Sequence, residues 1–157
     1  MHSKKTKSSF EPADIAGIYQ AAVRFRSAIE SCSASDLPIT FHNFPRGSCG
    51  DTTPLLGTYL IDGGFGMFDY VLAESYKGKK QRSHAWLGRG TLVIDITADQ
   101  FPDVSESVIV TLDSPWHRAW RGKVQHGADY RLYGVEDGAG RVLHDAYRTL
   151  IRQIPAG

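Results

Sequence analysis

The spacing of the apolar residues changes from helical to strand-like at Asp62-Gly63-Gly64. Before this point, apolar side chains recur at helical spacing over residues 12–32 and again after residue 48. After it, they form short runs typical of strands. The expected strands cover residues 67–73, 83–87, 91–96, 108–112 and 129–135, and a closing helix covers residues 141–154. Two helices followed by several strands and a helix predict an α+β fold with an antiparallel sheet.

The segments between these elements are expected to be short. Residues 39–42 are predicted to be extended, residues 77–80 to form a hairpin tip, and residues 137–140 to form a turn. A chain of 157 residues is long enough to bury a core without disulfides or a metal. We therefore expect residues 1–10 to be a disordered basic tail and residues 11–157 to be a single domain.

Charge and hydropathy argue against several classes of partner. The net charge of +1 creates no long-range field for nucleic acid or anionic lipid. No apolar run approaches the roughly 18 residues needed to span a bilayer. The N-terminus lacks the apolar stretch of a secretory signal. These features predict a cytoplasmic protein without nucleic-acid or membrane partners, with export as an effector or toxin as an alternative, and they leave the oligomeric state open.

Two cysteines are present, and free thiols in a reducing compartment are expected for both. Cys32 is expected to be a small buried side chain. Cys49 stands where the second helix is predicted to begin, and there the positive end of the helix macrodipole favours the thiolate. Its backbone N–H has no partner within the helix and is free to donate to an oxyanion. Cys49 is the candidate nucleophile, with Ser48 and Gly50 as candidate substrate contacts.

His84 and Asp95 lie on two predicted strands joined at Gly88-Arg89-Gly90. A hairpin that turns around Arg89 and Gly90 pairs residues whose numbers sum to about 179, which places the two side chains near each other on one face. A carboxylate inside the apolar run 92–96 is costly to bury unless it is paired. We expect Asp95 to accept from one imidazole nitrogen while the other faces Cys49. A structural hydrogen bond is the alternative.

The order of Cys49, His84-Ala-Trp86 and Asp95 resembles the core of the transglutaminase-like branch of the papain-like cysteine enzymes. The resemblance covers residues 44–100. It implies a papain-like core in which a helix bearing the nucleophile packs on an antiparallel sheet bearing the histidine and the aspartate. It also implies that Cys49 is the nucleophile, His84 the general base and then acid, and Asp95 the orienting group.

Other positions extend or modify this resemblance. Asn43 lies six residues before Cys49, the spacing at which papain-like peptidases carry an oxyanion-hole glutamine. Trp86 and Gln100 are further candidates for substrate contacts. Gly50 stands where animal transglutaminases have an aromatic residue, which favours hydrolysis over crosslinking.

The resemblance implies hydrolysis or transfer of an amide acyl group through a thioester, as in a cysteine peptidase, glutamine deamidase or transglutaminase. A protein or peptide substrate and no cofactor are expected. Two alternatives stay open: an arylamine N-acetyltransferase-like enzyme, and a non-catalytic binding domain that retains the fold.

The remaining histidines do not suggest a metal site. His42, His126 and His144 lack the spacing of a zinc-binding pair with a carboxylate. Trp116 and His117 are expected to pack, with lining of the cleft or supply of an imidazole in place of His84 as alternatives.

Overall fold

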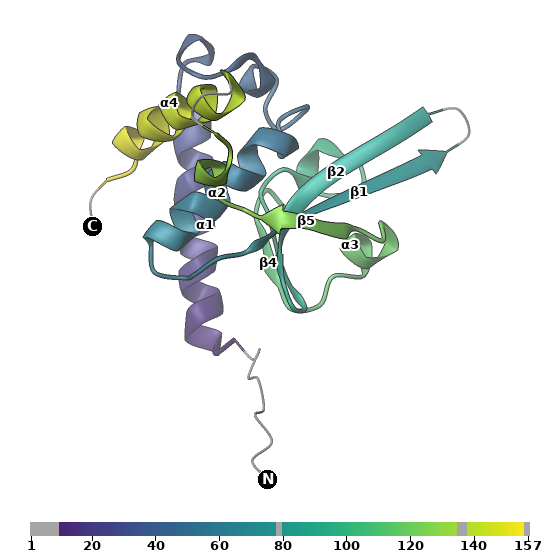
Figure 1. Ribbon diagram of the computed structural model, residues 1–157. Helices are drawn as coiled ribbons and strands as arrows, with labels where there is room; N and C mark the ends of the chain where they lie inside the picture. Colours follow the sequence, from purple (N-terminus) through teal and green to yellow (C-terminus); the bar gives the residue numbers. More distant parts are fainter. Residues whose placement is uncertain (1–9, 78–79, 135–137, 156–157) are drawn as a thin grey trace.

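The computed structural model describes residues 10–77, 80–134 and 138–155. Within these ranges the chain forms four α-helices and a five-stranded sheet (Figure 1). The helices are α1 (Pro12–Ser31), α2 (Cys49–Asp62), α3 (Pro115–Ala119) and α4 (Gly138–Gln153). The strands are β1 (Asp69–Lys77), β2 (Lys80–Arg89), β3 (Leu92–Asp95), β4 (Ile109–Thr111) and β5 (Lys123–Gly127). Every strand pairing is antiparallel, in the order β4-β3-β2-β1-β5. The predicted α+β class with an antiparallel sheet is confirmed.

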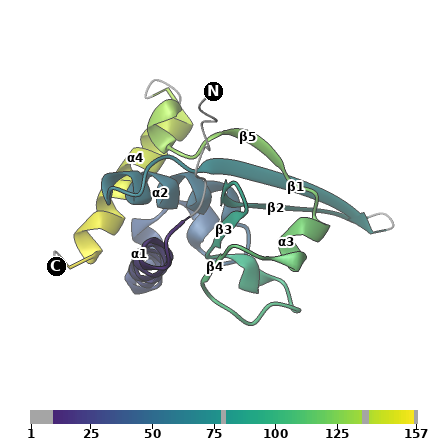
Figure 2. The ribbon, with the colours of Figure 1, turned by 90° about the horizontal axis from the view of Figure 1, so that it is seen from below.

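The helices α1, α2 and α4 gather on one side of the molecule, and the sheet extends from them with α3 on its far side (Figures 1 and 2). Both views show the β1–β2 hairpin reaching away from the helices. One main core joins the helices to the sheet, and its buried side chains include Phe25, Leu56, Leu87, Ile94 and Leu150. Burial of this continuous apolar surface holds α2 against β2.

Local sequence explains where α1 begins and how closely α2 packs. Pro12 occupies the first turn of α1, where its missing N–H is not needed, and Glu11 and Asp14 form a reciprocal capping box. In α2, a Cβ at Gly57 would overlap the carbonyl oxygen of Ala128. Glycine at this position therefore lets α2 pack closely against the segment that follows β5.

The β2–β3 hairpin turns one residue later than predicted. Leu87 pairs with Ile94 and Arg89 with Leu92, so paired numbers sum to 181 rather than 179. The two loop residues are Gly90 and Thr91, and the positive φ of Gly90 (59°) suits the first position of such a loop. A register shift of two residues keeps every side chain on its expected face.

Several predicted segments differ from the structure. Ile39–Phe41 forms a 3₁₀ turn rather than an extended segment. Where a strand was expected over residues 129–135, the described residues 129–134 instead contain a 3₁₀ turn, Tyr130–Leu132, in which the Asp129 side chain accepts from the Arg131 N–H. Residue 135 lies outside the described residues. The short helix α3 was not predicted. The strand β5 was not predicted either, because it is an exposed edge strand with no apolar alternation.

The remaining predictions concern segment ends. Helix α4 begins at Gly138, three residues earlier than predicted, which overturns most of the turn expected over residues 137–140. The basic tail, apart from Phe10, lies outside the described residues, as do residues 78–79 of the hairpin tip and residue 137 of that turn. None of the described helices is both long enough and apolar enough to cross a membrane.

Candidate active site

Cys49 is the first residue of α2, and the turn before it sets this position. Gly47 has a positive φ of 71°, a conformation that favours glycine. The Ser48 hydroxyl is fully buried and donates to the Pro45 carbonyl oxygen at 2.9 Å. The Ser48 carbonyl in turn accepts the Thr52 N–H at 2.8 Å. Ser48 therefore fixes the start of the helix with its side chain turned away from a substrate, and it leaves Cys49 at the positive end of the helix.

The structure brings His84 and Asp95 into direct contact. The Nε2–H of His84 donates to Oδ2 of Asp95 at 2.6 Å, and both side chains are almost completely buried. The other carboxylate oxygen, Oδ1, accepts from the backbone N–H of Thr97 at 2.9 Å and from its hydroxyl at 3.3 Å. With Nε2 held by Asp95, His84 lies close enough to the thiol of Cys49 for each group to shift the pKa of the other.

These contacts shift the pKa values of the three groups in a consistent direction. Burial raises the pKa of the Cys49 thiol, but the hydrogen bond and charge of His84, with the Ala85 N–H, bring it below its ordinary value. Burial lowers the pKa of His84, but the charge and hydrogen bond of Asp95, and then Cys49, raise it to about 9. Both shifts favour the thiolate–imidazolium pair over the neutral thiol and imidazole.

A second imidazole binds the same carboxylate. His117, on α3, donates its Nε2–H to Oδ2 of Asp95 at 2.8 Å. Its Nδ1 lies 2.5 Å from the Ser114 hydroxyl, which also accepts the His117 backbone N–H at 3.2 Å. Burial raises the pKa of Asp95, but the charge of His84 and the hydrogen bonds from both histidines hold it well below its usual range. His117 was expected mainly to pack; the only signal in the sequence is the Ser-Pro pair that begins α3.

Four aromatic rings surround His84. The ring centroids of Phe101, Trp86, Trp116 and Trp120 lie 5.1, 5.6, 5.7 and 5.9 Å from its centroid. As a result, His84 has 0% of its surface exposed. The exclusion of water strengthens the electrostatic contacts of the imidazole with Asp95 and Cys49. We call these four rings the aromatic shell.

Three rings of the aromatic shell also form the wall of an open hollow of about 240 Å³. Ser75 and Arg82, which are directly opposite each other on β1 and β2, form another side of it. Asp103 completes the rim and accepts the indole N–H of Trp116 at 2.9 Å. This hollow is therefore separated from His84 by the aromatic rings, and it presents both apolar and charged surface.

The other predicted site residues differ in how closely they approach His84 and Cys49. The Gln100 side-chain nitrogen is 3.4 Å from Nδ1 of His84 and donates to the Thr97 carbonyl at 3.0 Å. The Asn43 side chain is exposed and makes no hydrogen bond to another described residue. Gly50 is exposed beside Cys49.

Tyr70 was not predicted to belong to the site. Its hydroxyl lies 3.7 Å from the position that a Cβ on Gly50 would occupy. Burial, and then the negative charge of Cys49, raise the pKa of Tyr70 to about 12. The hydroxyl therefore keeps its proton and is a donor beside the nucleophile. Only its place in the apolar run 67–73 was apparent from the sequence.

The cluster of His84, Asp95 and His117 has donor atoms of the kinds that bind metals, all within 4.8 Å of one another. Two ligand atoms of one tetrahedral zinc ion, at bond lengths of 2.0–2.1 Å, lie about 3.3 Å apart. The two histidine nitrogens are 2.6 and 2.8 Å from the same carboxylate oxygen. These separations are those of hydrogen bonds.

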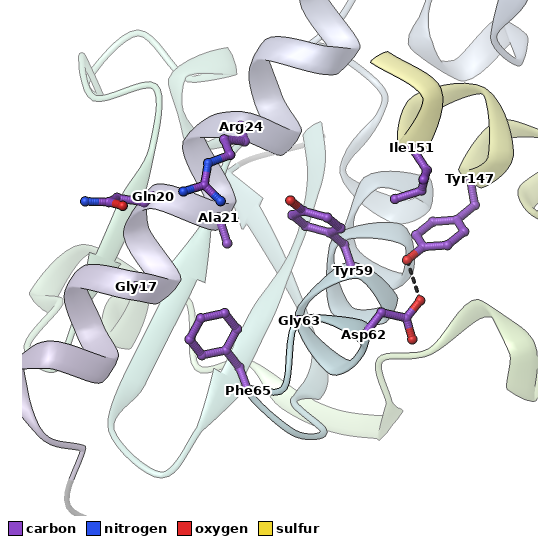
Figure 3. A pocket seen from close by; sticks show the side chains of 10 residues that line it. All are labelled: Gly17, Gln20, Ala21, Arg24, Tyr59, Asp62, Gly63, Phe65, Tyr147 and Ile151. Carbon is purple, nitrogen blue, oxygen red and sulfur yellow. Dashed lines mark hydrogen bonds between the residues drawn. The ribbon is translucent and has the colours of Figure 1, made fainter. Parts of the chain in front are cut away.

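A larger hollow, of about 460 Å³, lies among the helices (Figure 3). Helices α1, α2 and α4 supply most of its wall, and the Tyr147 hydroxyl donates to Asp62 there at 2.6 Å. No cysteine or histidine is among the described residues that line it. Cys49, His84 and Asp95 therefore lie elsewhere, at the start of α2 and on the sheet.

Comparisons with protein-family models, with curated proteins and with solved structures gave no match to this chain.

Proposed function

We propose that this protein is a thiol-dependent enzyme that cleaves or transfers an amide acyl group. The single observation that supports this most is the position of His84, which is hydrogen-bonded to a buried carboxylate through Nε2 and lies close enough to Cys49 to lower the pKa of its thiol. A nucleophile, a base and an orienting group in this chain of contacts form the arrangement that activates a thiol.

In the first step of the proposed reaction, the Cys49 thiolate attacks the amide carbonyl carbon. A C–S bond forms and the π electrons move onto oxygen. The backbone N–H of Cys49 and the Tyr70 hydroxyl are the proposed donors to this oxyanion. When the carbonyl re-forms, the C–N bond breaks and the His84 imidazolium gives its Nδ1 proton to the leaving nitrogen. The products are an amine, a thioester and a neutral imidazole.

The second step resolves the thioester. Neutral His84 takes a proton from water or from an acceptor amine, which attacks the carbonyl carbon as the C–S bond breaks and the thiolate leaves. Asp95 keeps the Nε2–H of the imidazole in place throughout and stabilises the imidazolium that forms again. Water yields an acid, and an amine yields a new amide.

The proposed fold assignment is the transglutaminase-like branch of the papain-like enzymes, with residues 11–157 as one catalytic domain. We propose a protein or peptide substrate, because the nucleophile is partly exposed at a helix start and an open hollow adjoins the aromatic shell. Exposed Gly50, with no side chain to cover Cys49 from solvent, favours water as the acceptor.

Alkylation by iodoacetamide tests the activated thiol directly, with site-resolved mass spectrometry as the readout. Cys32 is the internal control, since burial and then the charge of Asp36 raise its pKa. We expect Cys49 to react faster than Cys32 near neutral pH, and His84→Gln to remove this difference. Equal rates at the two cysteines, unchanged by His84→Gln, would contradict the proposal and favour a non-catalytic binding domain.

Intact-mass analysis with glutamine-containing peptides then separates the possible outcomes of the reaction. Deamidation adds about 1 Da to the peptide, incorporation of an added primary amine indicates transglutamination, and backbone cleavage indicates a peptidase. The Cys49→Ser variant is the control in each case.

A further inference from the structure

We propose that His117 is a positioning residue of this site, which fixes the Asp95 carboxylate and through it sets the orientation and proton affinity of His84. The proposal rests on the function proposed above. In a site of three residues the chain of contacts ends at the carboxylate. Here it continues to His117 and Ser114.

The carboxylate of Asp95 is held by four donors. Oδ2 accepts from His84 and His117, at 2.6 and 2.8 Å, and Oδ1 accepts twice from Thr97. Removal of the Thr97 contacts would free one oxygen, and removal of His117 would leave the other with His84 alone. His117 is therefore the one side chain that competes directly with His84 for the same oxygen.

The His117 ring is itself held on three sides. Trp86 and Trp116 meet it edge-on, with centroid separations of 4.9 and 4.8 Å. The Ser114 hydroxyl lies against Nδ1 and also accepts the His117 N–H, so one side chain caps the start of α3 and orients the ring. His117 is 2% exposed. Such a ring has little freedom to turn away from Asp95.

Sharing of one oxygen has a direct chemical effect. A carboxylate oxygen that accepts from two N–H groups offers each less negative charge than it would offer one. The groups that face His84 are Cys49 from α2, Asp95 from the end of β3 and His117 from α3. Loss of the His117 donor leaves Asp95 to pull more strongly on His84, whether His117 is neutral or cationic. His84 then gives its proton to the leaving nitrogen less readily in the first step.

Two variants of His117 separate positioning from packing. His117→Gln keeps a neutral N–H donor, and His117→Phe keeps a ring but has no donor. We expect His117→Phe to raise the pKa of His84 by about one unit, measured from its ¹⁵N imidazole shifts, and His117→Gln to restore the wild-type value. The pH profile of Cys49 alkylation should move in parallel. A merely structural residue would change the thermal midpoint without moving the His84 titration.

Ser114→Ala keeps the test decisive if His117→Phe does not fold. It frees the His117 ring and is expected to move the His84 titration in the same direction by a smaller amount. A His84 titration unchanged in every folded variant would overturn the inference. That result differs from failure of the proposed function, in which wild-type Cys49 would be unreactive even though the His84 titration could still be followed.

Discussion

Two groups of polar side chains are tied together by carboxylates in this molecule, and they differ in one respect. The first, for which we propose reactivity and which we call the reactive cluster, consists of Cys49, His84, Asp95 and His117. The second, the helix-side cluster, consists of Thr58, Asp62, Asp129, Arg131 and Tyr147. Here Asp129 accepts from Thr58 and Arg131, and Asp62 accepts from Arg131 and Tyr147, at 2.6 to 3.1 Å. Both are well hydrogen-bonded.

The difference lies in the donors. Arginine stays charged and tyrosine stays neutral near neutral pH, so no proton can move within the helix-side cluster. In the reactive cluster the donors are imidazoles, and one of them also faces a thiol. A hollow of about 460 Å³ nevertheless adjoins the helix-side cluster (Figure 3). A paired carboxylate and a pocket therefore do not identify a reactive site. Such a site also needs a proton that can leave and a nucleophile that can attack the substrate.

The largest expected effect comes from removing the charge of each carboxylate in turn. In Asp95→Asn the amide no longer fixes the His84 tautomer, and turnover should fall by about ten-thousandfold. The matched Asp129→Asn change should cost roughly 1–2 kcal/mol of stability and leave the alkylation rate of Cys49 unchanged. Rates of Cys49 alkylation and turnover, with thermal unfolding of both variants, check the pair. Equal losses of Cys49 alkylation in Asp95→Asn and Asp129→Asn would mean that the two clusters do not differ in this way.

A smaller effect is expected from the hydroxyl beside the nucleophile. Tyr70→Phe removes a proposed oxyanion donor and should slow acylation by a chromogenic ester by about a hundredfold. Alkylation by iodoacetamide forms no oxyanion, so its rate should not change. Tyr130→Phe is the control, since that hydroxyl bonds to His144 at 2.9 Å on the helix side. An ester reaction that is equally fast in Tyr70→Phe would exclude Tyr70 from the oxyanion site.

The pH dependence should also belong to the reactive cluster alone. Acylation needs a thiolate at Cys49 and a proton on His84. It is lost at low pH, below the lowered pKa of Cys49, and again above about pH 9, where His84 loses its proton. Since the charge of Cys49 contributes to the raised pKa of His84, Cys49→Ser should lower that pKa, as measured by imidazole NMR. A His84 titration unaffected by Cys49→Ser would show that the two groups are not coupled.

The smallest effect is expected in the helix-side cluster. Tyr147→Phe removes one hydrogen bond to Asp62 and should cost about 1 kcal/mol of stability. Denaturant unfolding measures this loss, and Cys49 alkylation serves as the readout for the distant site. A change in alkylation rate would mean that the two clusters are linked through α2.

The sequence predicted the parts of the site that depend on local structure. Cys49 was placed at a helix start from its turn residues and glycines, and His84 and Asp95 were placed on one face by counting along a hairpin. The count was two residues off in register, yet the face was right because side chains alternate with a period of two.

The parts that could not be predicted depend on contacts between distant segments. His117 is 22 residues from Asp95 and lies on a five-residue helix, which is too short to show a periodic pattern. Tyr70 approaches Gly50 only because β1 passes beside the start of α2. Strand β5 has four exposed residues out of five, so its sequence carries no buried face to recognise.

Because His84 is completely enclosed, the aromatic shell also controls access to its imidazole. The Nε2 proton shared with Asp95 can exchange with solvent deuterium only when the groups that enclose His84 move apart, so it cannot exchange faster than they open. A substrate that must displace the same groups to reach the imidazole can be turned over no faster than they open. The exchange rate of one buried proton is thus a lower limit on the opening rate, which in turn limits how fast the proposed reaction can run.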